Sequence, residues 1–155
     1  MKVRWLVAFL LAAFTGVAAA QQGQVPTTET ALGSVRIPRS VKADGKDLKA
    51  GTYTVRLTAQ DASPSVAGQK MERWAEFVQG GKVAGREVVS IVPNSEMKDL
   101  MPGPDSGKGP GNGARVEMLK GNDYMRVWIA RNGVNYLIHL VPNATMASKP
   151  AARKK

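Results

Sequence analysis

The dipeptide Asn132-Gly133 separates two runs rich in β-branched and aromatic residues, and it constrains the fold more than any other feature of the chain. Both residues accept positive φ at low cost, as the two-residue turn of a type I′ β-hairpin requires. Counting outward from the turn sets the register of strands 124–131 and 134–141. One face carries the pairs Met125/Leu140, Val127/Ile138 and Ile129/Tyr136; the other carries Tyr124/Val141, Arg126/His139, Trp128/Leu137 and Ala130/Asn135. This pattern predicts an antiparallel hairpin with large side chains on both faces.

The same strand-like alternation recurs along the chain, without sustained helical periodicity. Further strands are predicted at residues 34–37, 52–58, 71–79, 82–92 and 114–120. In the strand 52–58, alternation predicts that Tyr53, Val55 and Leu57 face inward. A helix competes over 71–79, whose Glu, Arg, Ala and Met residues favour helices, but the short run ends in Gly-Gly, which favours a hairpin. We therefore predict an all-β fold, in which one domain over residues 31–145 forms an antiparallel β-sandwich or small barrel of about seven strands.

A Gly- and Pro-rich segment, residues 93–113, interrupts the predicted strands. Loops of this length inside a compact domain are either functional or mobile. Within it, residues 95–100 are predicted to form one helical turn with Ser95 as its N-cap.

The N-terminus has the three-part pattern of a secretory signal peptide. A cationic start of four residues precedes an apolar stretch, residues 5–17, and then Ala18-Ala19-Ala20. An uncleaved N-terminal anchor is the alternative, but residues 5–20 are marginally short for a membrane-spanning helix, which needs roughly 20 apolar residues. We expect a signal peptide over residues 1–20, cleavage after Ala20, no membrane span afterwards and a flexible lead-in over residues 21–30.

The chain contains no cysteine, which excludes a disulfide scaffold, thiolate zinc sites and cysteine nucleophiles. An exported chain without cysteine is more typical of bacteria than of eukaryotic secretion. The expected location is therefore the bacterial periplasm or the medium. The single histidine, His139, excludes a multi-histidine metal site within one chain, and we expect no metal and no other cofactor.

The formal net charge of +10 invites a nucleic-acid interpretation. Two of the positive charges, Lys2 and Arg4, belong to the predicted signal, and four more belong to residues 146–155, a basic tail that we expect to be disordered. The remaining bases are dispersed among acids, and no basic face with interleaved aromatics is visible. Nucleic acid is therefore not an expected partner.

Residues 45–53 read Gly-Lys-Asp-Leu-Lys-Ala-Gly-Thr-Tyr. The segment resembles the Gly-x-x-Leu-x-Ala-Gly-Thr-Tyr pattern of small secreted bacterial β-domains of unknown function. The resemblance implies a strand, a turn and a second strand that presents Tyr53 into a β-sandwich. It covers under a fifth of the chain and implies no catalytic residue.

Two clusters could bind a ligand. If the Gly80-Gly81 turn has two residues, Glu72, Trp74, Glu76 and Glu87 share a face, with Trp74 opposite Glu87. Acidic groups around a tryptophan are typical of sugar-cleaving sites, although a solvated face is the more ordinary interpretation. In the second cluster, Arg126, His139, Trp128 and Tyr124 could orient an anionic or aromatic ligand, although Trp128 buried in a second small core is the alternative.

No catalytic set is complete in the sequence, so the leading hypothesis is a secreted, non-enzymatic β-domain that binds an envelope component or a small ligand. The alternative is a small carrier of an apolar or glycan ligand near Trp128 and Trp74. A glycan-active hydrolase is a third possibility.

Overall fold

The computed structural model describes residues 25–62, 72–100 and 109–143. The predicted signal peptide, the start of the lead-in and the basic tail lie outside the described residues, and so do residues 101–108 of the Gly/Pro-rich segment.

The described chain consists almost entirely of strands, which confirms the all-β prediction. The elements are β1 (Thr30–Ile37), β2 (Val41–Ala43), β3 (Lys46–Leu48), β4 (Gly51–Asp61), β5 (Glu72–Gln79), β6 (Lys82–Pro93), α1 (Met97–Leu100), β7 (Gly113–Met118), β8 (Met125–Arg131) and β9 (Val134–Pro142). The segment over which a helix competed is a strand, β5, and the predicted helical turn is present as α1, although it begins at Met97 and Ser95 is therefore not its N-cap.

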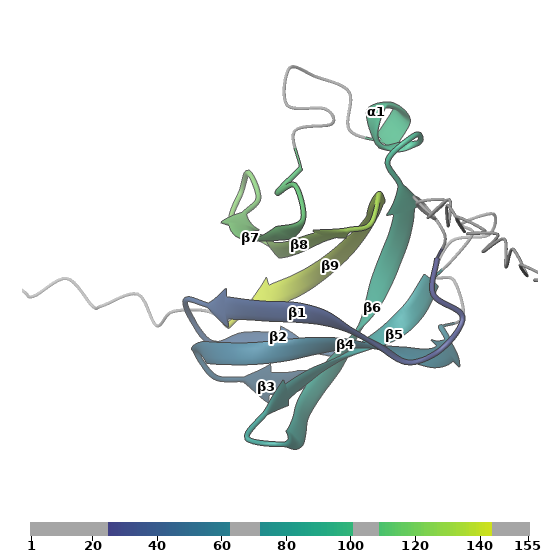
Figure 1. Cartoon of the computed structure of the whole chain (residues 1–155). Coiled ribbons are helices and arrows are strands. Elements are labelled where there is room, and N and C mark those ends of the chain that lie inside the picture. The colour runs from purple at the N-terminus through teal and green to yellow at the C-terminus, as the bar shows by residue number, and fades with distance from the viewer. Residues whose placement is uncertain (1–24, 63–71, 101–108, 144–155) are drawn as a thin grey trace, which may run out of the picture.

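The strands form one antiparallel sheet that curls into a nearly closed barrel (Figure 1). Neighbouring strands pair in the order β1-β4-β5-β6-β9-β8-β7, and β7 lies beside β1. Seven strands that alternate in direction leave the first and last parallel to each other. The seam between β1 and β7 is therefore the one place around the barrel where antiparallel pairing cannot continue.

The β2–β3 hairpin fills a gap at one end of the barrel. It turns at Asp44-Gly45, where both residues have positive φ, and β2 pairs with the end of β9 beyond the point where β6 leaves it. Leu48 packs closely against β6, because a Cβ placed on Gly85 would lie only 3.0 Å from its Cδ2. The glycine at this position thus allows the hairpin to lie against the barrel wall.

The Asn132-Gly133 hairpin has the predicted register. Both turn residues have positive φ, 51° and 77°, and the Cα partners from Met125/Leu140 to Ala130/Asn135 are those counted from the sequence. Local turn chemistry was sufficient here because a two-residue turn leaves only one way to pair the strands.

The prediction for the Gly80-Gly81 hairpin was wrong in its register. The turn does have two residues, but a β-bulge follows it, so that Phe77 pairs with Gly85 and Trp74 pairs with Val88. Glu87 lies opposite Ala75 and therefore on the other face from Trp74. One extra residue in a strand moves every later side chain to the opposite face, and the predicted cluster of four side chains is not formed.

The barrel interior is a filled apolar core. Buried residues from eight strands pack there, including Tyr53, Val55 and Leu57 as predicted. Tyr53 and Phe77 meet edge to face, with ring centroids 6.1 Å apart. A second, smaller core lies on the outer face of β8 and β9 and consists of Val92, Met97, Trp128 and Leu137.

Residues 25–29 of the predicted lead-in lie against the barrel. Val25 packs on the main core, and buried Arg73 donates a hydrogen bond to the Pro26 carbonyl. Glu29 forms an ion pair with Arg56 at 2.8 Å. These contacts connect the approach to β1 with β4 and β5.

Candidate functional site

The candidate site is built around Trp128 on the outer face of β8. The side chain is 1% exposed, because Val92, Met97 and Leu137 surround it in the second core. This is the buried arrangement that the sequence left open as the alternative for Trp128. Cations also lie over the ring: the guanidinium carbons of Arg115 and Arg126 are 4.9 and 5.4 Å from its centroid.

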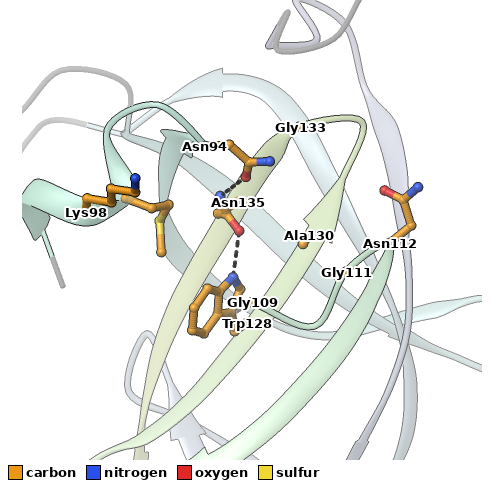
Figure 2. Close-up of a pocket in the computed structure, with 10 residues that line it drawn as sticks. Asn94, Lys98, Gly109, Gly111, Asn112, Trp128, Ala130, Gly133 and Asn135 are labelled. Atoms are coloured by element: carbon orange, nitrogen blue, oxygen red, sulfur yellow. Dashed lines mark hydrogen bonds between the residues drawn. The ribbon is translucent and has the colours of Figure 1, made fainter. Parts of the chain in front are cut away.

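A chain of side-chain hydrogen bonds runs outward from the indole (Figure 2). Trp128 Nε1 donates to Asn135 Oδ1 at 2.8 Å, and Asn135 Nδ2 donates to Asn94 Oδ1 at 2.6 Å. Asn135 Nδ2 also lies 3.3 Å from the Val92 carbonyl oxygen, an acceptor. Asn135 is only 2% exposed, so these bonds satisfy polar groups that water does not reach freely.

A pocket of about 450 Å³ lies above this chain of hydrogen bonds. We call it the Asn94 pocket; it is lined by Asn94, Met97, Lys98, Gly109, Gly111, Asn112, Trp128, Ala130, Gly133 and Asn135. Its walls come from α1, the β8–β9 hairpin and the two described ends of the Gly/Pro-rich segment (Figure 2). Gly109 crosses so close to Trp128 that a Cβ there would lie 2.8 Å from Cζ2 of the ring.

A second pocket of about 360 Å³ lies at the seam of the barrel, between β1 and the start of β7. Arg131 is the only charged residue in its described lining, and its Nη1 already donates to the Ala31 carbonyl at 2.6 Å. Its lining is otherwise mostly apolar and glycine, so the Asn94 pocket is the richer in free polar groups.

Four of the five predicted site residues lie together and the fifth does not. Arg126 donates to Glu117 Oε1 through Nε at 2.8 Å, and Tyr124 meets His139 edge to face with ring centroids 6.5 Å apart. Trp74 lies on β5, where the guanidinium of Arg86 covers its ring at 4.3 Å. Of the predicted residues, only Trp128 lines the Asn94 pocket within the described chain.

Besides Asn135 on β9, the polar pocket residues that were not selected from the sequence are Asn94, Lys98 and Asn112. All three belong to the 93–113 segment, whose unusual length was the one available signal. Nothing in the sequence pattern showed that this segment would meet Asn135 across the outer face of β9.

The pKa of His139 lies below its ordinary value near 6.5, because neighbouring groups displace water from part of the ring and the positive charge of Arg126 is near. We expect its titration, followed by NMR of the single imidazole in the chain, to have a midpoint below 6.5. The unfolded chain should titrate at its ordinary value, so this histidine's contribution to stability is present above pH 6.5 and is lost as the pH falls through the lower folded value.

Arg126→Met should raise that midpoint, whereas Arg36→Met, on the exposed face of β1, should leave it unchanged. A folded-state midpoint at or above 6.5 would contradict this assignment of the local environment.

Within residues 25–62, 72–100 and 109–143, no group of three or more His, Cys, Asp or Glu side chains is placed to hold a metal ion. The same residues contain no helix with the length and hydrophobicity to cross a bilayer.

No protein-family model, curated protein or solved structure matches the chain.

Proposed function

We propose that this chain is an exported, non-enzymatic binding domain of the bacterial cell envelope, and that the Asn94 pocket holds a small polar ligand such as a short glycan. The pocket itself carries the proposal. Its volume falls in the range of small-molecule sites, and it combines an apolar floor with a few convergent polar groups. The signal-like N-terminus supports export.

The packing of the barrel favours an external site over an internal one. Among the described residues, side chains such as Phe77 and Val127 are fully buried in the barrel interior, which favours a site outside it. A carrier function is therefore best placed at the same outer pocket near Trp128.

The distribution of carboxylates supports binding rather than hydrolysis. The described lining of the Asn94 pocket contains no Asp or Glu, whereas glycoside hydrolysis ordinarily uses two carboxylic acids. On β5, Glu76 is ion-paired with Arg56, and Glu87 lies on the opposite face from Trp74. Neither location presents a pair of free acids around a sugar-sized space.

The test is a binding screen of the purified chain against soluble glycans, read by ligand-observed NMR. We expect at least one glycan to bind, and Asn94→Leu to weaken its binding at least tenfold because both the pocket amide and its contact with Asn135 are removed. Gln60→Leu, an amide exposed on β4, is the matched control and should bind normally.

Circular dichroism of each variant separates loss of binding from loss of fold. Absence of binding across the panel, or turnover of a bound glycan, would contradict the proposed function.

A further inference from the structure

The indole of Trp128 determines which way the pocket amides point. An indole N–H can only donate, so the atom of Asn135 that meets it must be the oxygen. The amide nitrogen of Asn135 then faces Asn94, and the atom that it meets there must also be an oxygen. The Asn94 NH₂ group is consequently directed away from Asn135, on the side of Gly133 (Figure 2).

A separate hydrogen bond orients the side-chain amide of Asn112. Its Oδ1 accepts from the backbone N–H of Asn132 in the β-hairpin turn, at 3.2 Å. In Figure 2 its NH₂ group lies on the side of the amide away from the other labelled pocket residues. Lys98 lines the other side of the pocket and adds an ammonium group, which has donors and no acceptor (Figure 2).

The hydrogen bonds within the pocket therefore leave mainly side-chain donors for a ligand. The side-chain oxygens of Asn94, Asn112 and Asn135 each already accept a hydrogen bond from the protein itself. The side-chain groups left for a ligand in the described lining are NH₂ and NH₃⁺ donors, without a carboxylate to oppose a negative charge. A ligand that supplies acceptors matches the Lys98 ammonium and the Asn94 amide, and a negatively charged oxygen is the strongest acceptor for such donors.

We propose that the Asn94 pocket selects anionic, oxygen-rich small molecules, with a sugar acid as the class that suits it best. The inference rests on the proposed function and names the ligand class of the same site. The carboxylate of a sugar acid is placed between the Lys98 ammonium and the Asn94 amide. The sugar ring lies over the apolar part of the lining, which includes Ala130. Trp128 and Asn135 act as positioning residues, because they orient Asn94.

The experiment titrates the full chain separately with glucuronate, glucose and inorganic sulfate at constant ionic strength, by NMR or calorimetry. Glucuronate is expected to bind at least tenfold more tightly than glucose, and more tightly than sulfate. Asn94→Asp should weaken glucuronate binding at least tenfold. That variant still accepts from Asn135 but replaces the pocket-facing donor with a charged acceptor.

Gln60→Glu is the matched control, since it makes the same change of charge at an exposed position on β4 and should bind glucuronate normally. Equal binding of glucose and glucuronate would overturn the anionic preference and leave the proposed function standing. Sulfate binding as tight as that of glucuronate would overturn the assignment to a sugar acid. A chain that binds none of these probes and no member of the glycan panel would overturn the proposed function itself.

Discussion

Replacing Phe77 with alanine is expected to lower the free energy of unfolding by about 3–5 kcal/mol, the cost typical of truncating a buried phenylalanine. Phe77 is fully buried on the inner face of β5, where its ring meets the edge of Tyr53. Its partners across the sheet are Val55 and Gly85. Hydrogen-bonded strands on both sides hold the wall of the barrel, so the surrounding structure can collapse only partly into the space left behind.

Urea denaturation followed by far-UV circular dichroism measures this loss. Val83→Ala is the control, because Val83 is 44% exposed at the start of β6, and its truncation should change stability by less than about 0.5 kcal/mol. A loss below about 1 kcal/mol for Phe77→Ala would contradict a filled interior. It would also make the barrel interior a candidate binding site for an apolar ligand.

Asn135→Leu is expected to destabilise the chain by about 1–3 kcal/mol, the cost of leaving a buried donor without its acceptor. The donor left without an acceptor is the indole N–H of Trp128, which donates to Asn135 Oδ1; the Trp128 side chain is 1% exposed. The same substitution removes the group that orients Asn94, so ligand binding in the Asn94 pocket should weaken along with stability.

A double-mutant cycle with Trp128→Phe separates the hydrogen bond from packing. Phenylalanine has no N–H to strand, so the pair Trp128→Phe and Asn135→Leu should cost less than the sum of the two single substitutions, with a coupling of about 0.5–3 kcal/mol. Chemical denaturation of the four proteins gives that coupling. Strict additivity would contradict the orienting role of the indole.

Sequence reasoning was most accurate where structure is decided locally. The turn at Asn132-Gly133 and the alternation of Tyr53, Val55 and Leu57 are consequences of backbone preferences and of the two-residue period of a strand. Both were read without knowledge of any distant residue, and both are present in the structure.

The same reasoning failed where an irregularity in strand pairing interrupts the local pattern. Gly80-Gly81 does form a two-residue turn, but a bulge after it displaces Glu87 to the other face from Trp74. On β6, Gly85 lies against Leu48 of the β2–β3 hairpin, which comes from nearly forty residues earlier in the chain. No pattern within residues 71–92 contains that contact.

The candidate site shows the same division. Trp128 and its hairpin register follow from the sequence, as does the unusual length of the 93–113 segment. That Asn94 meets Asn135, that Gly109 covers the indole and that Asn112 bonds to the turn at Asn132 are tertiary facts. Each contact joins residues about 20 or more positions apart, and asparagine and glycine are common residues that carry no signal of their own.

The sequence by itself therefore determined the fold class and the pairing of its strongest hairpin, because turn chemistry and side-chain alternation act over a few residues. Only the tertiary structure decided how the sheet curls into a barrel with a parallel seam between β1 and β7, and which groups gather above Trp128. Those outcomes depend on packing and hydrogen bonding between segments far apart in the chain. As a result, the buried Trp128 lines a pocket in which hydrogen bonds orient the amides of Asn135 and Asn94.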